Sequence, residues 1–422
     1  MRILFLAHRL PYPPNKGDKL RSFWELQTLA RCHEVDLFCF YDDADDVQYF
    51  DAVRRHCRRL YAEPVSWWGS RGRALAAAVT GRSFTLSYFY SPDMAGQVSQ
   101  ALRTENYDAI FVYSSSMAQY AEQAKIPQIL DMADVDSDKW AQYASRFAGP
   151  KSWLWLREAR TLAAYENRIA TEFAATLLCT PAEAAILKRR VASARIGVLT
   201  HSVDADYYDP FATPLPPELA AWQPYVVFTG SMDYLPNADA AEFFCREIFP
   251  DLRRHVPSLQ FVIAGRNPAR AVKKLAEDPA VHVTGAVPDI RPYLRAAAAA
   301  VVPVRIARGV QNKILEAMAM GLPVATTSKV AAALPEAVQA KLIIEDDPRR
   351  FAACLAEQLQ RGPRPPVEEI RRSFAEHFSH AALAGQLEQV LQAVVAAASG
   401  CAGGARQGLV VKGEPVAGVQ RL

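Results

Sequence analysis

Short apolar runs that alternate with amphipathic stretches are the feature that most constrains the fold of this chain. The runs 3–7, 35–41, 109–113 and 176–179 are too short for helices and lack the polar–apolar alternation of half-exposed strands. Stretches such as 154–171 repeat apolar residues with the spacing of a helix face. Buried strands that alternate with helices predict an α/β chain built on parallel sheets.

The alternation stops at residues 209–224 and then starts again, which predicts two domains. This segment reads DPFATPLPPELAAWQP, and its five prolines interrupt both helices and strands. We therefore expect a doubly wound N-terminal domain over 1–208, a linker over 209–224 and a second doubly wound domain over 225–398, whose last helix returns to the N-terminal domain. The Gly-rich tail, 399–422, has no period and is expected to be disordered. Two Rossmann-like domains of this kind face a central cleft, and ligands bind at the carboxyl ends of their strands.

Composition and charge narrow the classes of protein. Half of the 422 residues are hydrophobic and 22% are charged, which is a globular composition. The formal net charge of +3 is too small for a dedicated nucleic-acid-binding protein, so no nucleic-acid partner is expected. Seven cysteines without a C-x-x-C pair indicate reduced thiols. The apolar runs are shorter than a signal-peptide core or a membrane span, so we expect a cytoplasmic protein.

Residues 301–324, VVPVRIARGVQNKILEAMAMGLPV, hold the pattern with the clearest chemistry. A strand is expected to end near Val304, followed by a loop with Arg305, Arg308 and Gly309 and by a helix from about Gln311. Free N–H groups at a helix start and nearby cations attract phosphate oxygens, and a glycine lets the backbone approach the ligand. This arrangement suits a nucleoside diphosphate.

Lys313 and Glu316 are three residues apart on the expected helix and therefore share one face. The ammonium of Lys313 can add to the phosphate charge, and the carboxylate of Glu316 can accept hydrogen bonds from ribose hydroxyls. An ordinary surface ion pair between these two side chains is the alternative that the spacing alone leaves open.

The same segment resembles the donor-site signature G-x-x-x-K-[IVL]-x-E-A-M-A-x-G-x-P-V of the retaining GT-B glycosyltransferases (family 4-like, group 1). Gly309, Lys313, Ile314, Glu316 and Gly321 all fit it. The segments VHVTGAVPDIRPYL, VVFTGSMDYLPNADA, FVIAGRNP and VLTHSVDADYYDP resemble other blocks of that family, so the resemblance extends over most of residues 1–395. It implies a GT-B fold and transfer of a sugar, with retention, from a nucleotide-diphosphate sugar. The nucleotide sugar is a substrate, and neither a cofactor nor a metal is implied.

The resemblance also implies roles for individual residues. Arg308 and Lys313 are expected to stabilise the leaving diphosphate. The residues expected to contact the donor are Gly230, Arg266, Arg305, Gly309, Gln311, Asn312, Ile314 and Glu316. The family usually has a Glu eight positions before Glu316, where this chain has Arg308; this departure leaves the donor sugar open. The loop after Gly230 reads SMDYLPN, without the family's usual cations, so Arg266 and Arg305 are expected to supply phosphate charge.

A narrower resemblance concerns the context of the reaction. LPYPPNKGDKLRSFWELQTLA, DMADVDSDKWAQYA, GSMDYLPN and RIARGVQNKILEAMAMGLPV together are similar to the glycosyltransferases of exosortase/PEP-CTERM exopolysaccharide clusters. This similarity implies a lipid-linked or polysaccharide acceptor and a place at the inner face of the cytoplasmic membrane.

The first half of the chain holds the candidate acceptor residues. The segment PNKGDKLR, residues 14–21, joins the first expected strand to the first expected helix, where Gly17 can adopt positive φ and cations surround a helix start. It is expected to contact the donor diphosphate or an anionic acceptor, and a helix capped by Asp18 is the alternative. Asp131 and Asp134 follow the run 128–130 and are expected to contact an acceptor hydroxyl. The residues expected on this acceptor or phosphate side are Lys16, Gly17, Asp18, Arg21, Asp131 and Asp134.

Residues 54–82 carry seven arginines against one acid, Glu63, with Trp67 and Trp68 between them. Basic residues with interfacial tryptophans favour anionic membrane surfaces, so this segment is a candidate for peripheral membrane contact. A solvated basic face with buried tryptophans is the alternative.

Two other functions stay open at this point. One is a sugar-nucleotide 2-epimerase, which shares the two-domain fold but needs acid and base residues at its site. The other is a non-catalytic protein that binds a nucleotide sugar or a glycan, a reading that Arg308 in place of the usual Glu favours.

Overall fold

The computed structural model describes residues 1–14, 17–65, 77, 81–146, 149–306, 309–361 and 367–400. The chain forms two compact units, which are described separately. Among the described residues, Met1–Thr200 and 384–400 form the first unit, and His201–Leu383 belong to the second. Residues 209–224 are thus part of the second unit, and the chain changes unit at Thr200–His201. The prolines do not make this segment an open linker, because a 3₁₀ turn over Pro217–Trp222 buries Leu219 in the core of the second unit.

The first unit is built on a seven-stranded parallel sheet with strand order β3-β2-β1-β4-β5-β6-β7. Its strands are β1 Arg2–Ala7, β2 Glu34–Tyr41, β3 Arg59–Pro64, β4 Ala109–Tyr113, β5 Gln128–Ala133, β6 Ala175–Leu178 and β7 Ile196–Val198. The central strands β1 and β4 are buried on both faces, which explains their uninterrupted apolar sequences. The strand order reverses between β1 and β4, and in sheets of this kind ligands bind beside such a reversal.

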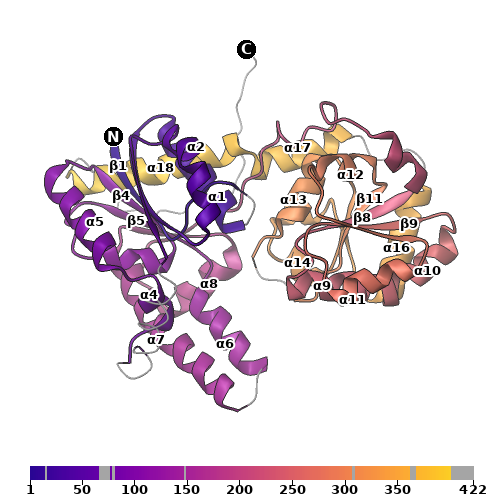
Figure 1. The fold of residues 1–422 in the computed structure, drawn as a ribbon, viewed down its shortest axis with the longest axis horizontal. Coiled ribbons are helices and arrows are strands. Elements are labelled where there is room, and N and C mark those ends of the chain that lie inside the picture. Colours follow the sequence, from indigo (N-terminus) through magenta and orange to yellow (C-terminus); the bar gives the residue numbers. More distant parts are fainter. Residues whose placement is uncertain are drawn as a thin grey trace. The chain divides into compact units, whose positions relative to one another are not determined.

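Helices cover both faces of this sheet (Figure 1). They are α1 Gly17–Ala30, α2 Phe50–Arg54, α4 Phe84–Tyr88, α5 Pro92–Thr104, α6 Asp136–Arg146, α7 Pro150–Glu172, α8 Pro181–Arg190 and α18 His380–Ala398. The 3₁₀ turns Ala44–Tyr49 and Ser115–Tyr120 complete the unit. Within the described residues, α18 is the one helix long and apolar enough to cross a membrane by length and composition. Its Leu387, Val390 and Leu391 are buried, and 28% of its most apolar window is buried in all.

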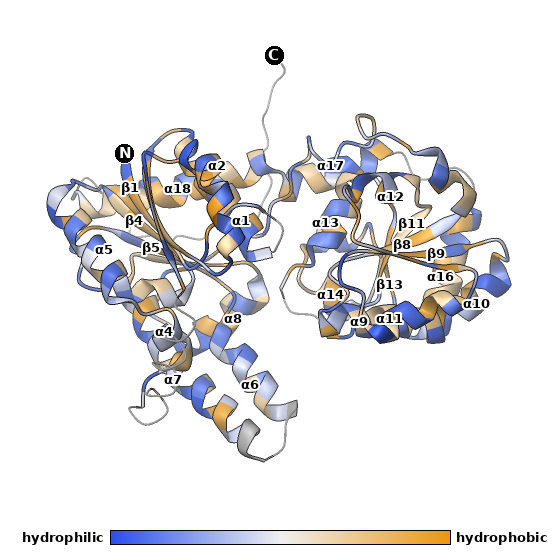
Figure 2. Cartoon of the chain, viewed as in Figure 1, coloured by the Kyte–Doolittle hydropathy of each residue, from blue (hydrophilic) through white to orange (hydrophobic). Residues whose placement is uncertain are grey.

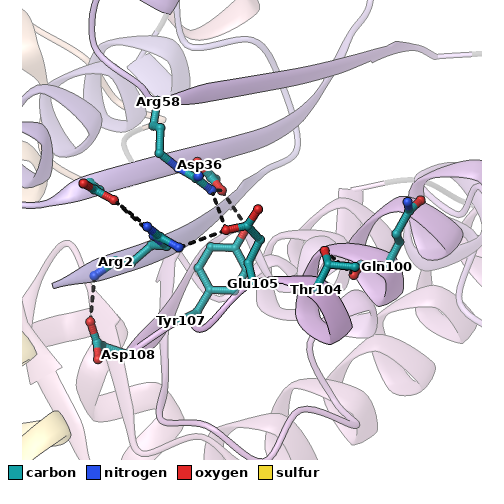
Figure 3. Close-up of polar contacts among 9 residues, drawn as sticks. Arg2, Asp36, Arg58, Gln100, Thr104, Glu105, Tyr107 and Asp108 are labelled. Carbon is teal, nitrogen blue, oxygen red and sulfur yellow. Dashed lines mark hydrogen bonds and ion pairs between the residues drawn. The ribbon is translucent and has the colours of Figure 1, made fainter.

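A polar network holds the amino ends of the strands of the first sheet (Figure 3). Arg2, at the start of β1, donates to Glu105 at 2.9 Å, and Arg58 lies 3.2 Å from the same carboxylate. Arg58 also donates to the buried Asp36 of β2, which accepts the Tyr107 hydroxyl at 2.7 Å. These charges neutralise one another, so the network has a structural role. It lies at the edge of the sheet opposite the carboxyl ends of the strands, where ligands bind in sheets of this kind.

The second unit is built on a six-stranded parallel sheet with strand order β10-β9-β8-β11-β12-β13. Its strands are β8 Tyr225–Thr229, β9 Gln260–Ala264, β10 Val281–Gly285, β11 Ala299–Val302, β12 Val324–Thr326 and β13 Ile343–Ile344. The order reverses between β8 and β11, both of which are completely buried. The loops that follow these two strands therefore meet at one place on the carboxyl edge.

Helices again lie on both faces of the sheet, and bands of hydrophobic residues run along them (Figures 1 and 2). They are α9 Leu235–Phe243, α10 Phe249–His255, α11 Arg270–Lys274, α12 Arg291–Ala296, α13 Asn312–Ala319, α14 Ser328–Ala331, α15 Glu336–Gln339, α16 Pro348–Gln360 and α17 Val367–Phe378. A π-helical turn, Phe244–Ile248, joins α9 to α10, and a 3₁₀ turn, Leu275–Glu277, follows α11. The two parallel sheets confirm the α/β fold expected from the alternation.

Candidate functional site

The candidate site of the second unit lies where the strand order of its sheet reverses. Gly230 follows β8, and Arg305 and Gly309 follow β11 and precede α13. The N-cap residue of α13 is Gln311, and its side chain makes no capping hydrogen bond to the first turn of the helix. The backbone therefore directs helix-start N–H groups and the positive end of the helix dipole toward this edge.

Lys313 is the central cation of this site. Its Nζ donates to Oδ1 of Asn237 at 2.6 Å and lies 4.6 Å from the centroid of the Phe228 ring. Burial lowers the pKa of Lys313 to about 8, and the negative charge of Glu316 acts in the opposite direction. An ammonium group that has lost water and hydrogen-bonds to a neutral amide is well placed to gain an anionic partner.

Glu316 lies one turn further along α13, where the Tyr208 hydroxyl acts on its carboxylate. Burial raises the pKa of Glu316, while the charge of Lys313 and the hydrogen bond from Tyr208 lower it. Tyr208 is fixed in turn, because Arg371 donates to its carbonyl at 2.9 Å and to the carbonyl of Ala319 at 2.5 Å. Lys313 and Glu316 thus have different partners, in contrast to the simple surface ion pair that the spacing left open.

Two glycines bring backbone segments together beside the ammonium of Lys313. Gly230 has φ of +152°, and a Cβ there would lie 2.7 Å from Nδ2 of Asn237 and 3.3 Å from Nζ of Lys313. Gly265, at the end of β9, has φ of +155°, and a Cβ there would lie 1.7 Å from the carbonyl oxygen of Gly230. Only residues without a side chain allow this close approach, so the loop after β8 stays against α13.

The start of α13 contains a buried polar atom with an unused hydrogen-bonding capacity. Oδ1 of Asn312 is buried, and no described group donates to it. Gly309, just before the helix, has φ of +63°, as a glycine in a tight loop can. Ile314, by contrast, is completely buried in the hydrophobic core of the unit, so its side chain packs inside the unit.

The two described arginines near this site have protein partners. Arg305 forms an ion pair of 2.5 Å with Asp239, and its guanidinium lies 4.4 Å from the centroid of the Phe243 ring. Nε of Arg266 lies 3.3 Å from the Ser231 hydroxyl, in the loop after β8. Contact of either arginine with a phosphate stays a prediction. Arg308, expected to share the catalytic role with Lys313, lies outside the described residues.

The loop between β1 and α1 in the first unit was expected to contact an anion, and that contact stays a prediction. Asp18 accepts from Arg9 at 2.6 Å and lies 3.4 Å from Nε2 of His8, so its carboxylate pairs with side chains. Burial opposes ionisation, but His8 and Arg9 hold the pKa of Asp18 well below its usual range. Gly17 is the first residue of α1 and does not adopt positive φ. Lys16 lies outside the described residues.

Arg21 and Asp131 meet inside the first unit. Nη2 of Arg21 lies 2.5 Å from Oδ2 of Asp131, and Nε lies 3.2 Å from Oε1 of Glu25. All three side chains are at most 1% exposed, and Arg21 also donates to the Thr200 carbonyl at 3.1 Å. Asp131 is part of β5, whereas the sequence placed it after the strand. The observed geometry gives this pair a structural role, and an acceptor contact by either residue stays a prediction.

Asp134 lies just beyond β5, where Oδ1 accepts from the Cys179 thiol at 2.9 Å. The preceding residue, Ala133, has φ of +58°, and Ser114 at the end of β4 has φ of +80°. Non-glycine residues pay a conformational cost in this region, and such strain collects at functional edges. The strain lies at the carboxyl edge of the sheet, beside Asp134, whose contact with an acceptor stays a prediction.

The sequence interpretation missed three partners of the predicted residues. Asn237 accepts a hydrogen bond from Lys313, and Tyr208 lies beside Glu316. Glu25 pairs with Arg21. Asn237 and Tyr208 lie in segments that resemble the glycosyltransferase family, which is the signal that marks them. Glu25 has no such signal, because an acid four residues from an arginine on a helix is ordinary.

Solved structures resemble this chain along nearly its whole length. HepE from Anabaena, in complex with UDP and glucose, has 13% identity and a TM-score of 0.64, covering 93% of this chain and 100% of its own. Sucrose-phosphate synthase from Thermosynechococcus elongatus has 16% identity and a TM-score of 0.66, covering 94% and 100%. A glycosyltransferase from Rickettsia africae has 12% identity and a TM-score of 0.62, covering 93% and 98%. At these identities the likeness establishes the fold.

Family models match both units. The model described as "Glycosyl transferase 4-like domain" matches residues 25–200, and "Glycosyl transferases group 1" matches residues 223–361. The chain belongs to the GT-B glycosyltransferases. In this glycosyltransferase, the second match contains Gly230, Asn237, Lys313 and Glu316. No curated protein sequence is similar enough to it to count as a match.

Proposed function

We propose that this glycosyltransferase moves a sugar from a nucleotide-diphosphate sugar to a lipid-linked or polysaccharide acceptor in exopolysaccharide synthesis. The reaction retains the anomeric configuration and uses no bound metal. The observation that carries the proposal is the partly desolvated ammonium of Lys313 beside a helix start, with Gly230 and Glu316 next to it. HepE, which shares the fold, binds UDP and glucose. That precedent supports a uridine diphosphate sugar as the first donor to test.

Each described group has a distinct task in this proposal. Lys313 and the N–H groups at the start of α13 bind the diphosphate and stabilise the charge that grows as it leaves. Glu316 accepts hydrogen bonds from the ribose hydroxyls, and the buried Oδ1 of Asn312 accepts another donor group of the ligand. Arg308 adds positive charge by its place in the sequence. The leaving diphosphate takes the proton of the acceptor hydroxyl on the same face of the sugar, which preserves the configuration.

A thermal-shift panel of nucleoside diphosphates and their sugars tests the donor site. A ligand at a hundred times its dissociation constant adds about 2.7 kcal/mol of stability. We expect one nucleotide class to stabilise the wild type and Glu316→Ala to lose most of that shift. Glu336→Ala, at an exposed glutamate of the same unit, is the matched control. Stabilisation by no nucleotide would contradict the proposal and favour a glycan-binding protein without this donor site.

The affinity for a nucleotide sugar is expected to fall by about tenfold between pH 7 and pH 9. Lys313, with a pKa of about 8, loses its proton over this interval in the free protein, while the bound diphosphate favours the charged form. The diphosphate diester keeps its charge over the same interval, so the loss of affinity comes from a group of the protein. Titration calorimetry should also show proton uptake on binding near pH 8.5. Lys313→Arg, which stays charged, should remove the pH dependence; a dependence that persists would assign it to another group.

The proposed place of action is the inner face of the cytoplasmic membrane, where lipid-linked acceptors are presented. The basic segment 54–82 is the surface that the sequence indicates for this contact. In the structure Arg58 pairs with Asp36, and the guanidinium of Arg59 lies 5.3 Å from the centroid of the Phe38 ring. Trp67 and Trp68 lie outside the described residues. Arg54 also pairs with Asp51 at 2.9 Å, and Arg71 and Arg73 lie outside the described residues, so membrane contact by this segment stays a prediction.

A further inference from the structure

The α6–α7 hairpin is a surface feature of the first unit that the donor site does not use. Its two antiparallel helices project away from the sheet (Figure 1), and hydrophobic and hydrophilic bands alternate along them (Figure 2). Trp140 of α6 and Trp155 of α7 hold the helices together, with parallel rings whose centroids are 4.8 Å apart. Tyr143 packs edge-on against Trp140 at 5.7 Å.

The far part of the hairpin exposes large apolar side chains. Trp153 is 66% exposed and Leu156 is 37% exposed. These residues are three apart on α7 and therefore share one face, which continues one turn later in the exposed Arg160. An apolar strip followed by a cation is the arrangement of helices that lie at the lipid–water interface.

Between Asp138 and Glu158 the charge of the same segment has one sign, although Lys139 lies 3.8 Å from Asp136 at the start of α6. From Lys139 to Arg157 the sequence contains four cations and no aspartate or glutamate, together with three of the seven tryptophans of the chain. Anionic lipid headgroups attract such a cationic stretch, and tryptophan is the residue that prefers the headgroup region. The charge is therefore complementary to an anionic bilayer surface.

The base of the hairpin is fixed to the body of the unit. Glu158 is buried and accepts from the Ser83 hydroxyl at 2.6 Å and from the N–H groups of Phe84 and Thr85 at 2.6 and 2.9 Å. Arg157 donates to the carbonyl of Arg82 at 3.1 Å. The exposed strip before Arg157 is thus held on a rigid support, which limits the entropy lost when it binds a surface.

We propose that the far part of the α6–α7 hairpin inserts into the interface of an anionic membrane through Trp153 and Leu156. The inference deepens the proposed function, and rests on it, because it names the element that holds the enzyme at its lipid-linked acceptor. Two exposed apolar side chains are too few for a stable protein interface, which needs roughly 20–30 residues on each side. A bilayer needs only a few inserted side chains, with the cations binding headgroups.

Co-sedimentation of the full chain with vesicles tests this insertion. One set of vesicles contains phosphatidylcholine alone, and the other contains equal parts of phosphatidylcholine and phosphatidylglycerol. We expect the wild type to bind the anionic vesicles and high salt to weaken the binding. Trp153→Ala/Leu156→Ala should bind at least roughly tenfold more weakly. Phe211→Ala, at a residue of the second unit that is 68% exposed, is the matched control and should bind like the wild type.

Three results would overturn the proposal: no binding by the wild type, equal binding to both kinds of vesicle, or unchanged vesicle binding by the double variant, whether or not that variant loses self-association. Hydrogen exchange of the wild type supplies a readout that does not depend on the folding of a variant. Vesicles should protect residues 136–160, and protection confined to 54–82 would contradict the inference. These measurements use no nucleotide, so their failure is separate from failure of the thermal-shift panel.

Discussion

Replacing Arg21 with methionine is expected to lower the free energy of unfolding of the first unit by about 3–5 kcal/mol. The guanidinium lies between Asp131 and Glu25, and all three side chains are at most 1% exposed. Without it, Asp131 is left in the interior without its ion-pair partner. Burial and the neighbouring Asp131 already raise the pKa of Glu25 well above its usual range. Two carboxyl groups therefore lose the one cation between them.

Hydrogen exchange of the amides of β1, β4 and β5 measures this loss, since these central strands open only when the unit unfolds. Their exchange should become faster by roughly two to four orders of magnitude. Arg31→Met, at an exposed arginine just after α1, should change stability by less than about 0.5 kcal/mol. A small loss for Arg21→Met, combined with poor use of the acceptor, would instead assign Arg21 to acceptor binding.

Replacing Lys313 with alanine is expected to lower the rate of sugar transfer by about 30- to 150-fold. The variant loses a charge-assisted contact to the diphosphate, worth about 2–3 kcal/mol. This contact strengthens as the diphosphate leaves, so the loss should appear in kcat as well as in the affinity for the donor. Steady-state transfer and the dissociation constant of the nucleotide sugar measure the two parts separately.

Lys329→Ala is the matched control for Lys313→Ala, because Lys329 is an exposed lysine of the same unit. It should leave both quantities unchanged. Thermal unfolding of each variant without ligand shows whether the fold is intact. If Lys313→Ala transferred sugar within about twofold of the wild type, Lys313 would not stabilise the leaving group.

The sequence predicted the fold better than the surroundings of the candidate site. Apolar runs mark buried strands wherever the run is continuous, as in β1, β4 and β8. They missed β3, whose residues are only partly buried and include Arg59 and Glu63, because an edge strand needs no apolar run. They also missed the short β7, Ile196–Val198.

The site residues divide in the same way. Lys313 and Glu316 were predicted from a local motif, and the structure brings them to the reversal of strand order in the second sheet. Their partners were not predicted, since Asn237 lies 76 positions from Lys313. In the first unit, Arg21 and Asp131 were expected to face a ligand. They pair with each other across 110 positions of sequence, which the sequence did not predict, and their contact with a ligand stays a prediction.

By itself the sequence determined the α/β fold, the division into two sheets and the helix that carries Lys313 and Glu316. These features depend on hydrophobic periodicity and on neighbouring residues, which act over a few positions of the chain. Only the tertiary structure decided which charges are neutralised inside the protein and which are offered to a ligand. The order of the strands places distant side chains together, and the burial that results sets the cost of each charge. The buried Arg21 is therefore matched by Asp131, whereas Lys313 hydrogen-bonds to a neutral amide, the feature on which the proposed diphosphate site rests.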